Sequence, residues 1–363
     1  MQTKRIIHII TTIERGGAEN AVATLAISQA EKGLCVSVFP LKGQNELGEL
    51  LTSNGVEVLT NGLNKNFFRQ IIEIRKLRKV ESIYHAHLPR AEILSRISLW
   101  AKQLVITRHN SECFFPSAPD FISRSLSRWV TKKSLVIAIS HAVLDFLTTK
   151  KELHQSCRTE VIYYGYRKKN QRRGSSLKSK SSNEFTFQIG TVSRLAHQKN
   201  LPLLIMLTKS LCLEGYLVNC SIMGDGPLLE ELENYTSSND IDSLVAFLGK
   251  SKEPLVFMQS LDLFVLTSNY EGFGLVLLEA MDVGIPIIAS NVSAIPEVLG
   301  GQHPGLFKAG SLADLVRVVR HFLDSPKRRE EVIMYQDKRL ELFTVEKYLD
   351  SHDLAYARFL DLR

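Results

Sequence analysis

Short apolar runs rich in β-branched residues alternate with longer amphipathic stretches along the chain. Parallel strands that are buried on both faces read as continuous apolar runs, and the helices between them repeat near 3.6 residues. The pattern therefore predicts βα units and an α/β fold class. Strands of the first half are expected near Arg5–Ile10, Cys35–Pro40, Val56–Leu59, Ser82–His85, Leu104–Thr107, Leu135–Ile139 and Glu160–Tyr163. Helices are expected between them, for example at Ala18–Glu31, Phe67–Lys79 and Arg90–Ala101.

A second βα series follows a polar, Ser- and Lys-rich segment at residues 167–183, which cannot bury apolar surface and is predicted to be a linker. Its strands are expected near Phe185–Val192, Leu217–Met223, Val245–Leu248, Leu263–Leu266 and Ile287–Ala289. Its helices are expected at Leu201–Glu214, Pro227–Ser237, Leu275–Val283 and Leu312–Leu323. We expect two Rossmann-like domains, at residues 1–166 and 184–344, with a helix at about 345–363 packing back on the first. Ligands of such sheets bind at the carboxyl ends of the strands, here in a cleft between the domains.

The sharpest candidate for chemistry is the segment at residues 271–281, which follows the predicted strand Leu263–Leu266 through a polar turn. Its two glycines allow a tight loop, and the helix that opens at Gly274 or Leu275 presents N-terminal amides on which a diphosphate could sit. Glu271 lies in the loop and Glu279 one turn into the helix, so both could address one ligand. On spacing alone, a loop acid and a helix surface acid are the favoured explanation.

A second candidate is the loop at residues 193–200, between a strand and a helix. Arg194 and Lys199 are five positions apart in it, and two fixed cations there could neutralise a departing diphosphate. Without further evidence, an arginine and a lysine in a loop are equally explained as ordinary surface residues. Gly224 belongs to a third strand-to-helix loop, at residues 223–228. That loop lacks the third glycine of a dinucleotide-binding fingerprint, since Leu229 stands in its place, which disfavours NAD.

These motifs, together with residues 284–290 and 295–298, resemble the large retaining glycosyltransferase family 4, which has the GT-B fold. Glu271 and Glu279, with seven residues between them, match its E-x7-E signature. The resemblance covers nearly the whole chain and is strongest at residues 189–299. The chain departs from the family at Ser293 and Ala294, where relatives often carry two glycines.

The resemblance implies roles for single residues. Glu271 would contact the transferred sugar and Glu279 the ribose hydroxyls, while Arg194 and Lys199 would clamp the phosphates. The backbone of the 271–281 segment would hold the sugar and the diphosphate through the amides of Phe273, Gly274 and Leu275.

The resemblance also points to residues outside that segment. The loop of Gly224 would lie beside the nucleotide, and Gly16 and Gly17, at the start of the first helix, would touch the donor phosphate or the acceptor. His109 would lie near the donor sugar and phosphate, and His87 is a candidate for contact with the acceptor. A structural turn is the alternative for the three glycines, and an ordinary structural histidine is the alternative for His109.

Charge is divided unevenly along the chain. Residues 1–180 hold 29 Lys and Arg against 14 Asp and Glu, a net charge of +15, while the remainder carries −8. The basic half, with basic amphipathic segments at residues 67–79 and 123–133, suggests contact with an anionic membrane surface. For either segment alone, a helix packed on its own domain with its charges in water is the favoured alternative. No zinc-finger spacing or RNA-binding motif indicates nucleic acid.

The cysteine pattern and the apolar runs indicate where the chain works. The five scattered cysteines favour a reducing cytoplasm over a zinc site or a disulfide framework. The first apolar stretch is too short for a signal peptide, and no run approaches the roughly 20 residues of a membrane span. The aspartates at 240 and 242 are expected to serve a turn rather than a metal. We therefore expect a cytoplasmic protein, peripheral at most on the inner membrane face.

Together the sequence predicts a hexosyltransferase-type enzyme that uses a nucleotide-diphosphate sugar, UDP being the favoured nucleotide, with no cofactor and no metal. The acceptor is expected to be a lipid-linked glycan of bacterial surface polysaccharide such as capsule, O-antigen or exopolysaccharide. The alternatives are a GT-B sugar-nucleotide epimerase, an NAD-dependent dehydrogenase, and a non-catalytic protein that binds nucleotide sugars or membranes.

Overall fold

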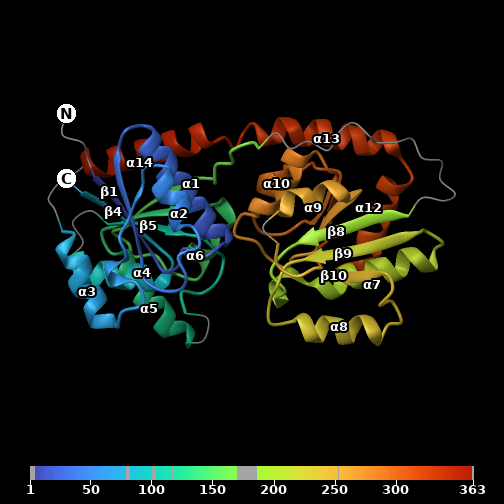
Figure 1. Cartoon of the computed structure of the whole chain (residues 1–363), viewed down its shortest axis with the longest axis horizontal. Helices are drawn as coiled ribbons and strands as arrows, with labels where there is room; N and C mark the ends of the chain where they lie inside the picture. Colours follow the sequence, from blue (N-terminus) through green and yellow to red (C-terminus); the bar gives the residue numbers. More distant parts are fainter. Residues whose placement is uncertain are drawn as a thin grey trace. The chain divides into compact units, whose positions relative to one another are not determined.

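The computed structural model describes residues 5–78, 82–99, 104–115, 118–169, 186–251 and 253–361. The chain divides into two compact units (Figure 1). The N-terminal unit comprises residues 1–167 and 343–363, and the C-terminal unit comprises residues 168–342. Residues 170–183, most of the predicted linker, lie outside the described part of the chain.

The described residues of the N-terminal unit form a seven-stranded parallel sheet in the order β3-β2-β1-β4-β5-β6-β7. Its strands are β1 (Arg5–Ile10), β2 (Cys35–Pro40), β3 (Glu57–Val58), β4 (Ser82–His87), β5 (Leu104–Arg108), β6 (Leu135–Ala138) and β7 (Arg158–Val161). Its helices are α1 (Gly17–Glu31), α2 (Gly48–Ser53), α3 (Phe67–Lys76), α4 (Pro89–Leu99), α5 (Asp120–Thr131), α6 (His141–Thr149) and α14 (Val345–Asp361). Strand order reverses between β1 and β4, the position where open α/β sheets bind ligands.

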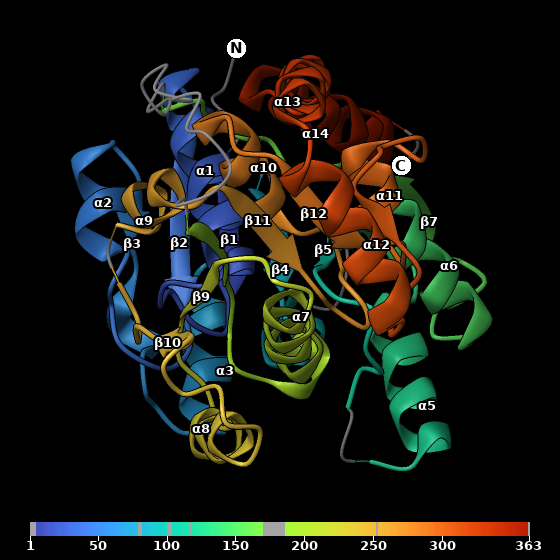
Figure 2. The same ribbon diagram turned by 90° about the vertical axis from the view of Figure 1, so that its right-hand side faces the viewer.

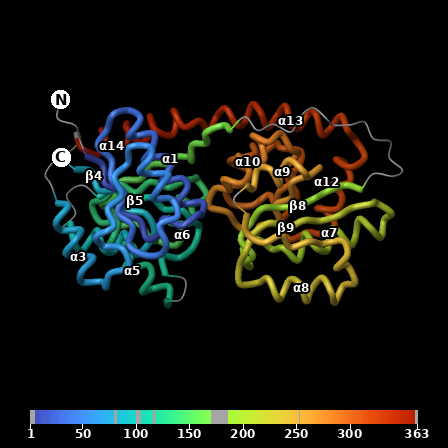
Figure 3. The backbone as a smooth tube through the Cα atoms, viewed as in Figure 1, coloured from blue at the N-terminus to red at the C-terminus, as the bar shows by residue number. Residues whose placement is uncertain are grey.

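Helices cover both faces of this sheet (Figures 1 and 3). One face packs on α3, α4 and α5 through side chains such as Ile7, Tyr84 and Ile106. The other face carries His8 and His85 at alternate positions and packs under α1 and α14, which contact each other. Because successive strand residues point to opposite faces, the alternation places the strand histidines together on the α1 and α14 side.

The described residues of the C-terminal unit form a six-stranded parallel sheet in the order β10-β9-β8-β11-β12-β13. Its strands are β8 (Phe187–Val192), β9 (Val218–Met223), β10 (Val245–Phe247), β11 (Leu263–Leu266), β12 (Ile287–Ser290) and β13 (Leu306–Phe307). Its helices are α7 (Leu201–Leu213), α8 (Leu229–Ser237), α9 (Pro254–Ser260), α10 (Leu275–Val283), α11 (Ile295–Leu299), α12 (Leu312–Leu323) and α13 (Pro326–Leu340). The 3-10 turn η2 (His197–Lys199) precedes α7.

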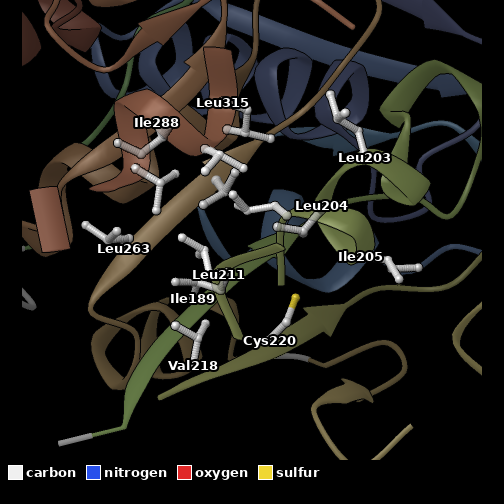
Figure 4. Packing of buried hydrophobic residues seen from close by; sticks show 14 of the residues in the cluster. Ile189, Leu203, Leu204, Ile205, Leu211, Val218, Cys220, Leu263, Ile288 and Leu315 are labelled. Atoms are coloured by element: carbon white, nitrogen blue, oxygen red, sulfur yellow. The ribbon is translucent and has the colours of Figure 1, made fainter. Parts of the chain in front are cut away.

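The core of the C-terminal unit lies between its sheet and the helices α7 and α12 (Figure 4). Ile189 of β8, Leu204 of α7 and Leu315 of α12 are fully buried there. Burial of each of these side chains contributes about 1.5–3 kcal/mol to stability. The packing of α7 and α12 on the sheet therefore fixes the strand ends from which the loops of the site emerge.

The α/β fold class is confirmed, and several predicted boundaries shift. β4 runs two residues further than expected, to His87, and β7 lies two residues earlier, because its partner β6 ends at Ala138. α8 begins at Leu229 rather than at residue 227, since the amide of Leu228 donates to the Leu195 carbonyl of a neighbouring loop. α3 ends at Lys76, earlier than the predicted 67–79 helix, and the last two residues of the predicted 90–101 helix lie outside the described residues.

Candidate functional site

The N-terminus of α10 is open. Gly274 precedes the helix with φ +90°, in the left-handed region that favours glycine, and no side chain caps the first turn. α12 and α13 differ, since Ser311 and Ser325 cap them by accepting from backbone amides. No acidic residue lies in the first turn of α10. The amides and the dipole of this helix end therefore suit an anionic ligand.

Glu271 lies just before this helix end and is almost completely buried, with 5% of its surface exposed. Its Oε1 accepts hydrogen bonds from the Lys199 ammonium at 2.5 Å and from the Ser268 hydroxyl at 2.7 Å. The Lys199 side chain is 15% exposed. Lys199 thus lies beside the open helix end, with its charge partly offset by a buried carboxylate.

Backbone contacts hold these two loops together. The Thr267 hydroxyl donates to the Lys199 carbonyl at 2.9 Å, and the Asn269 amide donates to the Gln198 carbonyl at 2.8 Å. The loops follow β8 and β11, which are neighbours in the sheet although Lys199 and Glu271 are 72 positions apart. Parallel pairing of the strands therefore brings the two sequence motifs to one place.

Arg194 is exposed, and no ion pair or hydrogen bond of its side chain occurs among the described residues. Its loop packs closely against Gly224. A Cβ on Gly224 would lie 1.8 Å from the Ser193 carbonyl oxygen, and this glycine has φ +147°. Close backbone packing accounts for this glycine, and the contact fixes the loop that carries Arg194.

Glu279 lies in the second turn of α10 and is partly buried. Burial raises its pKa to about 7, and the charge of Lys169 opposes the shift. Near neutral pH the carboxyl is thus partly protonated, so it can accept from or donate to a ligand hydroxyl.

The segment in which the chain departs from the resembled family also lies beside Glu271. The Ala294 amide is 3.5 Å from the Glu271 carbonyl oxygen, and Ala294 is fully buried. Ser293 has φ +49°, a conformation in which a glycine would be unstrained. The serine therefore occupies a backbone conformation of the kind that the relatives' glycines allow.

In the N-terminal unit, α1 also begins after a glycine, but its first turn carries a carboxylate. Glu19 folds back so far that a Cβ on Gly16 would lie 2.4 Å from its Oε2, and its Oε1 accepts from the Thr12 hydroxyl at 2.7 Å. A Cβ on Gly17 would meet no atom within 4 Å. The backbone at Gly17 is thus approachable, while the α1 N-terminus already has its own anion.

His87 and His109 belong to a buried chain of imidazoles. The His8 Nε2 lies 2.8 Å from the Gln29 oxygen, which can only accept, so this nitrogen donates. A neutral imidazole has one N–H, so the His8 Nδ1 accepts from the His87 Nε2 at 3.0 Å. In the same way the His87 Nδ1 accepts from the His109 Nε2 at 3.1 Å, and the His109 Nδ1 accepts from the Tyr164 hydroxyl.

Burial lowers the pKa of His8 to about 4 and of His109 to about 3, which agrees with neutral rings. The donor assignment leaves neither His87 nor His109 a ring nitrogen for a ligand. If His109 contacts a donor, it does so through its ring edge or its backbone.

Nitrogens of His8, His85 and His87 lie within 4.8 Å of one another, a spacing at which three imidazoles could hold a metal ion. All six nitrogens already take part in hydrogen bonds, those of His85 with Tyr356 and Thr107. An ion would have to break several of these bonds, so the cluster fits neutral, mutually bonded rings better.

Sequence reasoning missed His8, Gln29 and the aromatic residues of α14 that close this cluster. The alternation of histidine with apolar residues at positions 84–87 was a signal, because it places both histidines on one face of a strand. Asp242 accepts from the Ser237 hydroxyl at 2.5 Å at the end of α8, and Asp240 has φ +56°. Both aspartates thus serve a turn, as expected.

In the described part of the chain, no helix combines the length and the apolar character that a bilayer-spanning segment requires.

Two family models match the chain. The model described as "Glycosyl transferases group 1" matches residues 173–339, and the model described as "Glycosyltransferase Family 4" matches residues 15–167. The first match contains every candidate residue of the C-terminal unit, and the second contains those of the N-terminal unit.

Curated relatives resemble shorter segments. The capsular polysaccharide biosynthesis glycosyltransferase CapM of Staphylococcus aureus is 27% identical over 163 residues, 43% of this chain and 41% of that protein. The O-antigen biosynthesis glycosyltransferase WclY of Escherichia coli is 34% identical over 110 residues, 30% of each chain. The chain spans less than half the length of each of these two relatives.

Among solved structures, HepE of Anabaena in complex with UDP aligns with a TM-score of 0.80 over 98% of this chain and 100% of that chain. The two sequences are 20% identical, so the comparison concerns the fold.

Proposed function

Because the chain belongs to glycosyltransferase family 4 and has the GT-B fold, we propose that it is a hexosyltransferase-type enzyme. It moves a sugar from a nucleotide-diphosphate donor to an acceptor, with retention of anomeric configuration and without a metal ion. One observation carries the proposal: the uncapped N-terminus of α10 lies beside the buried Lys199–Glu271 pair. This arrangement suits a diphosphate next to a sugar that one carboxylate orients.

The proposed chemistry needs few protein groups. The bond between the anomeric carbon and the diphosphate oxygen breaks, and the acceptor hydroxyl forms a new bond to that carbon on the same face. Its proton passes to the departing phosphate oxygen. Lys199, Arg194 and the α10 amides stabilise the charge that develops on the diphosphate. Glu271 orients the sugar, since its hydrogen bonds to Lys199 and Ser268 hold its carboxylate in one position.

Glu279 binds the ribose hydroxyls of the donor in this proposal. A carboxyl whose pKa is about 7 offers a donor and an acceptor near neutral pH. UDP is the proposed nucleotide, and the HepE structures in complex with UDP and with UDP-glucose support this choice. Gly16, Gly17 and Gly224 lie in loops that would flank the donor or the acceptor.

The proposed acceptor is a lipid-linked glycan of bacterial surface polysaccharide. The names of CapM and WclY, which refer to capsular polysaccharide and O-antigen biosynthesis, support a surface-polysaccharide acceptor. The exposed apolar residues Phe68 and Ile72 of α3, next to the basic residues of the same helix, support a peripheral position on an anionic membrane surface at the cytoplasmic face.

The donor site is tested by the thermal shift of the purified protein with UDP, GDP, ADP and NAD, each in the presence of EDTA. We expect UDP to raise the melting temperature and the Arg194→Ala variant to lose most of the shift. The matched control is Arg328→Ala, which removes another exposed arginine of the same unit. A shift with NAD alone, or a UDP shift of equal size in the two variants, would contradict the assignment.

Catalysis is tested separately by Glu271→Ala. We expect this variant to bind UDP and to form no glycoside product. Product formation at the wild-type rate would remove Glu271 from the mechanism.

A further inference from the structure

Two pockets of the N-terminal unit adjoin each other, because Cys113 lines both. The β5 pocket, of about 240 Å³, lies at the ends of β4 and β5, where Leu88, Pro89 and residues 107–110 line it. The α5 pocket, of about 140 Å³, lies between the start of α5 and the end of α6, where Asp120, Arg124 and residues 149–152 line it. The helices α5 and α6 are drawn in green in Figure 2.

The β5 pocket is built on a buried arginine between two carboxylates. The Arg108 Nη2 lies 3.0 Å from the Glu92 Oε2, and its Nη1 lies 3.3 Å from the Glu152 Oε2. Glu152 offsets this buried guanidinium, and Glu92, whose pKa burial raises to about 7, adds part of a second negative charge near neutral pH. The positive charge of Arg108 is thus already paired with acidic groups, which disfavours an anionic ligand in this pocket.

The remaining polar groups of the β5 pocket suit hydroxyls. Glu92 is fully buried, and its Oε1 has no hydrogen-bond partner among the described residues. Asn110 and Glu112 add an amide and a second carboxylate, and the Asn110 Nδ2 donates to the Glu112 Oε2 at 3.0 Å, while Leu88 and the buried Phe114 line the pocket with apolar atoms. Carboxylate and amide oxygens that accept from hydroxyls, next to an apolar wall, are what an uncharged sugar ring requires.

The α5 pocket has the opposite charge. Arg124, Lys150 and Lys151 line it together with Asp120, which lies 3.7 Å from the Lys150 ammonium. Glu152 also lines it, but its carboxylate faces Arg108 and accepts from the Phe114 amide. The cations therefore outnumber the carboxylates that remain to neutralise them, and such a pocket suits a phosphate.

The helix that carries Arg124 also exposes apolar side chains. Phe121 is 64% exposed, Ile122 45% and Trp129 43%. Large apolar residues beside cations match the two halves of a lipid phosphate, since the phosphate meets the cations and the hydrocarbon covers the apolar face.

We propose that these two pockets and the exposed face of α5 bind one molecule, a lipid-linked sugar phosphate that serves as the acceptor. Its uncharged sugar occupies the β5 pocket, its phosphate or diphosphate occupies the α5 pocket, and its lipid chain lies along Phe121, Ile122 and Trp129. The role of this molecule as the acceptor rests on the proposed function. Its binding to the two pockets does not depend on catalysis.

The phosphate part is tested by calorimetric titration with geranyl diphosphate and with geraniol, in the presence of saturating UDP. UDP fills the donor site of the C-terminal unit, so a diphosphate cannot report on that site. We expect geranyl diphosphate to bind at least tenfold more tightly than geraniol. The double variant Arg124→Ala/Lys150→Ala should lose at least tenfold in affinity for geranyl diphosphate. The matched control, Lys327→Ala/Arg328→Ala, removes two exposed cations of α13 and should bind as the wild type does.

Equal affinity of the double variant and the wild type for geranyl diphosphate would overturn the assignment of the α5 pocket. Equal affinity for geraniol and geranyl diphosphate would reduce the site to an apolar surface and would also overturn it. Binding to phosphatidylglycerol vesicles that geranyl diphosphate does not displace would identify a general lipid headgroup instead. Failure of UDP to bind, with geranyl diphosphate binding as expected, would contradict the proposed donor function and leave this inference intact.

The sugar part is tested with geranyl diphosphate that carries glucose, galactose or N-acetylglucosamine. We expect at least one of these sugars to tighten binding over geranyl diphosphate, and Asn110→Ala to cancel the gain without changing the affinity for geranyl diphosphate itself. No gain from any of the three sugars, or a gain that Asn110→Ala leaves unchanged, would remove the sugar from the β5 pocket.

Discussion

The two units begin a helix in the same manner, after a strand and a glycine, yet they treat the helix end differently. At α1 the carboxylate of Glu19 folds back over Gly16, so the end is already matched with an anion. At α10 no side chain caps the helix and no acid lies in the first turn. Helix starts of similar sequence can therefore be filled or open, and one carboxylate three positions into the helix makes the difference.

The same contrast extends to the other polar groups of the two units. In the N-terminal unit each nitrogen of His8, His85 and His87 has a partner inside the unit. In the C-terminal unit Arg194 is exposed, and no described residue pairs with its side chain. The comparison teaches that a ligand site is recognised by polar groups that the fold leaves available, rather than by the number of polar groups.

Lowering the pH should produce the largest difference in stability between the two units. The pKa values of His8, His109 and His352 fall to between about 3 and about 4 in the folded state, because burial penalises the charged ring. Between these folded-state pKa values and the unfolded-state value near 6.5, the histidines bind more protons in the unfolded chain than in the folded one. Their contribution to the free energy of unfolding is therefore complete above pH 6.5 and is lost as the pH falls below it. We expect a loss of more than about 5 kcal/mol by pH 4, on the basis of these shifts.

Hydrogen exchange between pH 7 and pH 4.5, corrected for the intrinsic pH dependence of the rate, checks this. Peptides of the N-terminal unit should lose protection first. The C-terminal unit contributes one comparable group among its described residues, His303, whose pKa falls to about 4. Earlier loss of protection in the C-terminal unit would contradict the comparison.

Breaking the buried ion pair of the C-terminal unit should have the next largest effect. Lys199→Ala leaves the Glu271 carboxylate buried without its cation, and it should lower the free energy of unfolding by about 3 kcal/mol. UDP affinity should fall about tenfold, because a charge-assisted contact to a phosphate is lost. Urea unfolding and UDP titration measure the two quantities.

The matched control for that variant is Lys32→Ala in the N-terminal unit. Lys32 pairs with Asp350 and Asp353 of α14, but the lysine and both aspartates are exposed to solvent. Its removal should cost less than about 1 kcal/mol, the usual value of a surface ion pair. If Lys32→Ala lowered the free energy of unfolding more than Lys199→Ala does, burial would not determine how much each ion pair contributes.

The open helix end is tested by Gly274→Ala. The added methyl group meets a φ of +90° and lies 3.1 Å from the Leu277 Cδ1, so the loop has to shift at a cost of about 1–2 kcal/mol. UDP affinity should fall by about tenfold for a shift of this energy. Gly33→Ala is the counterpart in the other unit, where φ is +83° and the added methyl group meets no atom within 4 Å. UDP titration of the two variants should show a loss for Gly274→Ala alone.

The smallest effect is expected for Glu19→Gln. The change removes a negative charge from the first turn of α1 and should lower stability by about 0.5 kcal/mol, the ordinary size of a charge at a helix end. Urea unfolding at low ionic strength measures it. An increase in stability would mean that the carboxylate strains the helix end rather than filling it.

Much of the fold and part of the candidate site could be predicted from the sequence. The apolar runs located every strand of the two sheets except the two-residue strand β13, and the glycine before α10 marked an open helix end that the structure contains. The pair formed by Lys199 and Glu271 could not be predicted from spacing, since it depends on the adjacency of β8 and β11 in the sheet. The assigned roles of Glu271, Glu279, Arg194 and Lys199 stay predictions until the variants are measured.

The sequence by itself determined the local features of this protein, because apolar periodicity, glycine positions and charge density act between neighbours along the chain. Only the tertiary structure decided which polar groups have partners. His8 and His87 are 79 positions apart and meet because β1 pairs with β4, and that contact leaves His87 no nitrogen for a ligand. Hydrogen bonding and burial depend on contacts between distant segments, and these contacts set the pKa values and the availability of each group.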